Sequence, residues 1–169
     1  GIKVFMGSST GSLLVADDDG VGNILKVIQR RAAFHSEDEF RLEERKPLRV
    51  EGDPTSHPVW RDPEAAMRST QRLVALARKY GKRIHVLHIS TAEEIVFLAD
   101  HKDVATVEVT PHNLTLDETA YVRLGTYAQM NPPVRDAAHR AGIWAGVRNG
   151  VADILGSDHA PHTREEKDH

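Results

Sequence analysis

Short apolar runs alternate along the chain with longer stretches in which apolar residues recur every three or four positions. The short runs predict five strands, at 2–6, 32–35, 83–89, 104–109 and 151–156. The periodic stretches predict helices at 21–31, 36–46, 64–80, 91–101 and 137–148. Strands that alternate with helices favour an α/β fold with a parallel sheet.

Three segments lack either pattern and are predicted as loops. Residues 47–63 hold four of the eight prolines, and residues 110–133 are irregular around Asn131-Pro132-Pro133. The run Gly-Ser-Ser-Thr-Gly at 7–11 follows the first strand, and it fits a plain loop as well as a cradle of backbone N–H groups for an anion.

Composition narrows the class of protein. The chain has 169 residues, a net charge of −3 and no cysteine. The absence of cysteine excludes disulfides, thiolate metal sites and thiol catalysis. The slight acidity argues against a nucleic-acid or membrane partner, and no apolar run approaches the roughly 20 residues of a membrane span. We expect one domain in a cytoplasmic protein, and a homo-oligomer is possible.

Polar residues stand near the carboxyl ends of the predicted strands: Lys3, His35, His88 and Asp158. Catalytic groups gather at this end in α/β barrels and in open α/β sheets. Strand alternation places Ile84, Val86 and His88 on one face and His85 on the other, so the two histidines are not expected to share a metal.

The spacing of these residues favours a barrel. Lys3 and His35 are 32 residues apart, which is about one βα unit when eight units take roughly 250 residues. Five strands then leave about three units upstream. Because residues 1–6 read as a core strand without a lead-in, we expect residues 1–169 to be a single incomplete barrel domain, about strands 4–8, from inside a longer protein.

Histidine and aspartate at strand ends predict a metal site, because imidazole and carboxylate suit Zn²⁺ and its neighbours. Lys3 is a poor ligand as an ammonium group. Reaction with CO₂ would convert its amine to a carbamate anion with two oxygens that can bridge two cations. Taken singly, however, each histidine is more often a core or surface residue, Lys3 a strand-edge charge and Asn131 part of a turn.

Five blocks carry a resemblance to a known family. The segment 156–162, Gly-Ser-Asp-His-Ala-Pro-His, with Lys167 five residues on, is similar to the C-terminal signature of dihydroorotases in the amidohydrolase superfamily. Further blocks look like family motifs in the right order, at 1–11, 35–39, 85–90 and 130–135. The resemblance spans essentially the whole chain.

The resemblance implies a zinc-dependent (β/α)₈ barrel that interconverts dihydroorotate and carbamoyl-aspartate in pyrimidine synthesis. Lys3 resembles the carboxylated lysine that bridges two Zn²⁺ ions, and His35 and His88 resemble ligands on the next two strands. Asp158 resembles the last ligand and the general base. The implied substrate-binding residues are Asn131, Ala160 and His162. The family's first-strand His-x-His pair, and the Arg that follows it, have no counterpart in this sequence.

Three alternatives stay open at this point. A hydantoinase or allantoinase would share the Lys and His blocks, although Asn-Pro-Pro and Ala-Pro-His favour dihydroorotase. A non-catalytic homologue or partial barrel could act as a scaffold. A small doubly wound module could bind phosphate through the Ser-Ser-Thr loop, and it would need no metal.

Overall fold

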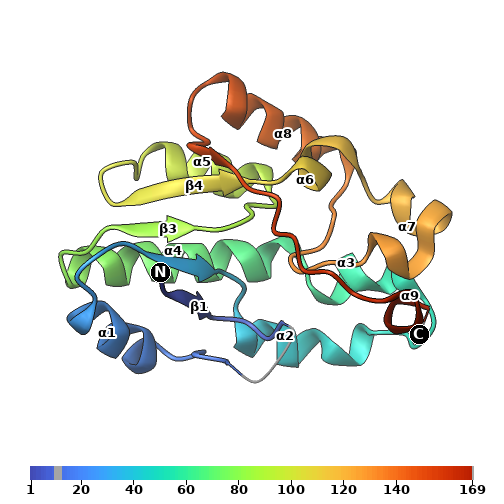
Figure 1. Ribbon diagram of the computed structural model, residues 1–169, viewed down its shortest axis with the longest axis horizontal. Coiled ribbons are helices and arrows are strands. Elements are labelled where there is room, and N and C mark those ends of the chain that lie inside the picture. The colour runs from blue at the N-terminus through green and yellow to red at the C-terminus, as the bar shows by residue number, and fades with distance from the viewer. Residues whose placement is uncertain (10–12, 169) are drawn as a thin grey trace.

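Five parallel strands form one sheet in the order of the sequence (Figure 1). The computed structural model describes residues 1–9 and 13–168. The strands are β1 (Lys3–Phe5), β2 (Ala32–His35), β3 (Ile84–Val86), β4 (Ala105–Val109) and β5 (Ile154–Leu155). Each named strand pairs in parallel with the strand next to it in the sequence, which is the connectivity of successive βα units in a barrel. The predicted fold class is confirmed.

Four helices cover one face of the sheet, and together with it they form the core. They are α1 (Asp18–Val27), α4 (Pro63–Lys79), α5 (Ala92–Ala99) and α8 (Ala137–Arg148). Alternate strand residues such as Val4, Phe34, Ile84, Val86 and Val107 are buried against them. The other strand positions therefore face away from the helices, where the interior of a barrel would lie.

Helix boundaries follow local chemistry. The side chains of Asp17, Asp62, Thr91 and Asp136 accept N–H groups in the first turns of α1, α4, α5 and α8. Helix α2 (Glu39–Arg45) begins later than predicted, because Asp38 caps it in place of Ser36. Three strands are shorter in the structure than predicted, because only part of each predicted segment pairs in the sheet. They are the strands predicted at 2–6, 83–89 and 151–156.

Two of the predicted loops contain short helices. Residues 47–63 include parts of η1 (Lys46–Leu48), then η2 (Pro54–Ser56) and α3 (His57–Trp60), with proline in the first turn of each. Residues 110–133 include α6 (Pro111–Thr115), α7 (Thr119–Leu124) and η3 (Gly125–Ala128). These helices have three to six residues, too short for a periodic pattern to reveal. Of the loop at 7–11, residues 10 and 11 lie outside the described residues.

The C-terminal segment passes along the carboxyl ends of the strands and ends in α9 (Arg164–Lys167) (Figure 1). The Thr126 hydroxyl of η3 donates to the Lys167 carbonyl there. Lys167 Nζ donates to the Gln129 carbonyl at 2.7 Å, and the Tyr127 hydroxyl donates to Asp168 at 2.9 Å. These contacts hold the motif at 156–162 against the loops that precede α8.

His57 joins the proline-rich segment to the loop of Asn131. Its Nε2 donates to the Met130 carbonyl at 3.0 Å, and its ring stands edge-on to Trp60 and Tyr121. Burial, with smaller contributions from the charges of Arg61 and Arg135, outweighs the opposing effects of the Met130 carbonyl and Glu37, and the net pKa of His57 is lowered to about 4. His57 is therefore neutral at pH 7.

This depressed pKa predicts a loss of stability in acid. Between pH 6.5 and about 4, the unfolded chain protonates His57 while the folded chain does not, so the free energy of unfolding falls as pH falls. The loss attributable to His57 is at most about 3 kcal/mol. In His57→Gln, whose amide can still donate to Met130, urea denaturation at several pH values should show a shallower decline. Parallel profiles for the two proteins would contradict the assignment.

Candidate active site

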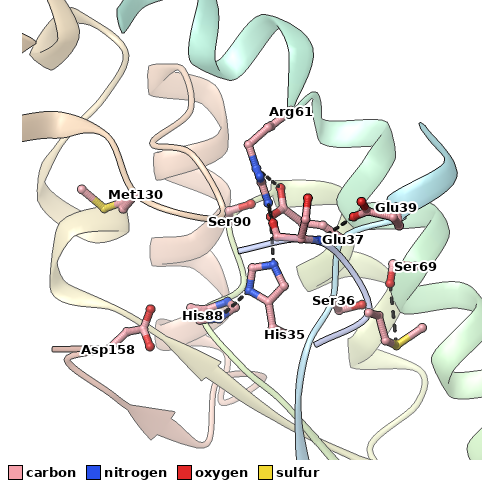
Figure 2. Close-up of polar contacts among 12 residues, drawn as sticks. His35, Ser36, Glu37, Glu39, Arg61, Ser69, His88, Ser90, Met130 and Asp158 are labelled. Carbon is pink, nitrogen blue, oxygen red and sulfur yellow. Dashed lines mark hydrogen bonds and ion pairs between the residues drawn. The ribbon is translucent and has the colours of Figure 1, made fainter. Parts of the chain in front are cut away.

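Two buried imidazoles face each other where β2 and β3 end. His35 Nδ1 lies 3.2 Å from His88 Nε2, and the rings meet edge to face with centroids 4.9 Å apart (Figure 2). Both side chains are almost fully buried, at 1% and 2% exposed. Burial holds the pKa of His88 well below its ordinary value, and the charges of His35 and Lys3 add to this effect. His88 is therefore a neutral imidazole, the form that binds metals.

The sequence pattern predicted these two histidines at one site, but it placed His88 on the wrong face. Ala33 pairs with His85, so continued alternation would put His88 on the helix-covered face, opposite His35. Instead β3 ends at Val86, and His88 takes a left-handed backbone conformation with φ of +37°. This turn directs its ring toward His35.

Glu108, on β4, lies beneath this turn. Its Oε1 accepts the backbone N–H of His88 at 3.2 Å, and its Oε2 lies 3.4 Å from His85 Nε2. Burial raises the pKa of Glu108, but the hydrogen bonds from His85 and the His88 N–H outweigh it, so the net pKa is lowered. Glu108 is not among the site residues predicted from the sequence. Its signal is an acid within the apolar strand Val-Glu-Val.

Lys3 and Asp158 form the second half of the candidate site. Lys3 Nζ lies 3.3 Å from Asp158 Oδ1, although the two residues are 155 positions apart in the chain. Asp158 also has a left-handed backbone, with φ of +44°, so among the described non-glycine residues only His88 and Asp158 have positive φ. Such conformations are costly for ordinary residues and concentrate at functional sites. The Lys3 side chain is 40% exposed.

A second layer of buried charge supports His35. His35 Nε2 lies 3.0 Å from Glu37 Oε2, within ion-pair distance, although the angle is too bent for a regular hydrogen bond. Arg61 pairs with Glu37 and also donates to the Ser8 carbonyl at 2.7 Å (Figure 2). Burial raises the pKa of Glu37, but Arg61 and His35 more than compensate and hold it well below its usual range. Glu37 lies within the family-like block at 35–39, and no role for it is predicted from the sequence.

A cavity of about 460 Å³ lies beside Asp158. Its lining includes the three predicted substrate-binding residues, Asn131, Ala160 and His162, together with Asp158. Asn131 Oδ1 is a buried acceptor for which the described residues provide no donor. His112 also lines the cavity, and burial lowers its pKa while the Asp158 charge opposes the shift. A small polar molecule would therefore meet amide, imidazole and carboxylate groups here.

The donor set fits a metal in part. Two tetrahedral nitrogen ligands at the usual zinc distance lie about 3.3 Å apart, which matches the separation of His35 Nδ1 and His88 Nε2. The His88 Nδ1 atom is buried without a partner within the described part of the chain. However, residues 1–9 and 13–168 bring no three His, Asp or Glu side chains together in a metal-sized cluster. The structure thus joins His35 with His88 and Lys3 with Asp158, as two pairs.

No family model matches the chain, but curated relatives do. A dihydroorotase of Halobacterium salinarum is 35% identical over 173 residues, which cover 98% of this chain and 39% of the relative. A dihydroorotase of Latilactobacillus sakei is 43% identical over 100 residues, or 57% of this chain and 23% of the relative. The chain thus spans well under half the length of these relatives.

Solved structures with the same fold include cyclic amidohydrolases. A dihydropyrimidinase from Brevibacillus agri superposes with a TM-score of 0.86 at 28% identity, covering 95% of this chain and 37% of that one. An L-hydantoinase from Arthrobacter aurescens gives a TM-score of 0.91 at 25% identity over 98% of this chain and 39% of its own. The chain is therefore similar in sequence to part of these dihydroorotases, and in fold to part of the dihydropyrimidinase and hydantoinase structures.

Proposed function

We propose that the chain contributes to the active site of a dihydroorotase, which hydrolyses the cyclic amide of dihydroorotate reversibly to N-carbamoyl-aspartate in pyrimidine synthesis. The observation that carries the proposal is the buried His35–His88 pair, whose two ring nitrogens face each other, together with the Lys3–Asp158 pair. Similarity to dihydroorotases over 98% of the chain supports the same reaction. A cytoplasmic location and a homo-oligomeric state are part of this proposal.

His35 and His88 would hold Zn²⁺ through the nitrogens that already face each other, with Asp158 as a further ligand. Lys3, once carboxylated, would bridge two such ions. Its exposed amine is accessible to CO₂, and loss of its positive charge would release Asp158 from the ion pair. The bound metal would polarise the ring carbonyl and lower the pKa of water.

Asp158 is proposed as the general base and then the general acid. Its carboxylate lies at the boundary between the cavity and the Lys3 side chain. It accepts a proton from the attacking water as the new C–O bond forms. It returns the proton to the ring nitrogen as the C–N bond breaks, so one group serves both directions of the reaction.

The cavity residues are proposed to orient the substrate. His162 would bind the carboxylate of the substrate ring. The side-chain amide of Asn131 would form hydrogen bonds with polar atoms of the same ring. The Asn131 Oδ1 atom suits this role because it is buried and lacks a donor within the described residues. Ala160, on the same lining, would contribute through its backbone.

The second candidate is a hydantoinase-type activity, which the dihydropyrimidinase and hydantoinase structures favour. Both readings use the same histidines and Asp158, and they differ in whether the ring carries a carboxylate. We further propose that about three βα units besides these five complete the barrel. The open sheet and the 39% coverage of a dihydroorotase support this.

Zinc content tests the metal proposal. Protein purified without chelators should contain stoichiometric zinc by elemental analysis. His88→Ala should lose most of it, because one of the two facing nitrogens is gone. His139→Gln, which alters a histidine on α8, should retain the wild-type content. Equal zinc in the wild type and His88→Ala would exclude the imidazole pair as ligands.

Asp158→Asn tests the proton transfer. The amide cannot accept the proton, so kcat for dihydroorotate hydrolysis should fall at least about 100-fold while circular dichroism stays unchanged. Asp100→Asn, an exposed change at the end of α5, serves as the matched control and should retain full activity. Substantial residual turnover in Asp158→Asn would remove its role as base.

His162→Ala tests the substrate class. If His162 binds a ring carboxylate, the variant should raise KM for dihydroorotate more than it lowers kcat. Its activity on hydantoin, which has no carboxylate, should change little. A wild-type protein that prefers hydantoin or dihydropyrimidine in the same panel would favour the second candidate.

A further inference from the structure

Glu108 stands outside every role assigned above, yet its carboxylate contacts the backbone of a proposed metal ligand. It is the last residue but one of β4, and its neighbours Val107 and Val109 are buried against the helices. Alternation therefore turns Glu108 to the opposite face, beneath the carboxyl ends of the strands. Its side chain is only 13% exposed, so its oxygens need partners within the protein.

Both oxygens of Glu108 find partners on β3 and the residues that follow it. Oε1 accepts the His88 N–H at 3.2 Å, and Oε2 lies 3.4 Å from His85 Nε2. His85 is itself held by the Thr106 hydroxyl, 2.9 Å from its Nδ1. The carboxylate is thus fixed in place from β3 and β4 together.

The next strand leaves room for this carboxylate. A Cβ atom built on Gly156 would lie 2.5 Å from the Glu108 carboxyl carbon and 2.6 Å from Oε2, closer than van der Waals contact permits. Gly156 has no positive φ that would require glycine. Space for Glu108 therefore explains this glycine, two residues before Asp158.

The left-handed turn at His88 needs such support. A non-glycine residue at φ of +37° is strained, and it persists only where its surroundings hold it in place. The His88 N–H has left the sheet ladder, and the Glu108 oxygen replaces the carbonyl it would otherwise bond. Without that acceptor, ordinary strand alternation would turn the His88 ring away from His35.

We propose that Glu108 is a positioning residue, which holds the backbone of His88 in its left-handed turn and so brings the His88 and His35 imidazoles together. It acts through the hydrogen bond from the His88 N–H and does not touch the substrate. The inference rests on the proposed function only in regarding the imidazole pair as a metal site. The geometry it explains is present without a metal.

The test uses the full chain without metal and compares three substitutions by NMR. Wild-type protein should show a nuclear Overhauser effect between the His35 and His88 rings. Glu108→Gln keeps an acceptor oxygen at the same distance and should retain the effect. Glu108→Asp keeps the charge but shortens the side chain, and it should lose the effect. Glu64→Gln, on the exposed surface of α4, is the control and should match the wild type.

Metal affinity should rank the Glu108 variants in the same order as the nuclear Overhauser effect does. Chelator competition should show Zn²⁺ binding about 10- to 100-fold weaker in Glu108→Asp, as expected when a residue that orients a ligand is lost, and much closer to wild type in Glu108→Gln. Wild-type protein that binds no zinc would contradict the proposed function. The NMR comparison without metal would still test whether Glu108 positions His88.

Retention of the His35–His88 effect in folded Glu108→Asp would overturn the proposal. If Glu108→Asp fails to fold, Gly156→Ala displaces the same carboxylate from β5, and it should also lose the effect. Hydrogen exchange needs no variant: the wild-type His88 amide should be protected although it lies outside the strand ladder. Exchange of that amide at the rate of an unstructured chain would likewise overturn it.

Discussion

Two-residue alternation along a strand is the constraint on which this site depends. Strand residues that face the helices form part of the core. A side chain that must reach the other face has to stand at an alternate position along the strand, or the regular strand has to end before it. His35 stands at a position that faces away from the helices, but His88 does not. Its left-handed backbone supplies the break. Asp158 carries the same kind of turn after β5, so both residues take part in the site only by leaving regular strand geometry.

Buried charge is the second organising feature. Arg61 and Glu37 are almost completely buried, and an unpaired charge in that position would carry a desolvation cost of several kcal/mol. Their pairing links the segment after α3 to the end of β2, and Arg61 extends it to the Ser8 carbonyl after β1. Arg135 donates in turn to the Arg61 carbonyl, which brings in the loop that carries Asn131. The loops around the cavity are therefore fixed by one continuous set of polar contacts.

Sequence pattern was sufficient for the order of elements and for the edge of the sheet at which the polar residues gather. Long helices such as α4 and α8 have clear periodicity and capping residues, and their predicted limits lie within one residue of the observed ones. Parallel strands placed Lys3 near Asp158 and His35 near His88. The pattern could not reveal the turn at His88, because a left-handed φ on a histidine leaves no trace in composition. Nor could it reveal the partners of Glu37 and Glu108, which come from other elements.

The two pairs explain why the described residues do not form a closed metal cluster. In the 3.2 Å contact between His35 and His88, one ring donates an N–H and the other accepts it, so the lone pair of only one of the two facing nitrogens is used. An ammonium group at Lys3 attracts the Asp158 carboxylate in the same way. A cation between the imidazoles would take both lone pairs at a similar separation, and a carbamate on Lys3 would repel Asp158 toward that cation. A change in charge at Lys3 would therefore favour the shared centre proposed above over the two internal pairs.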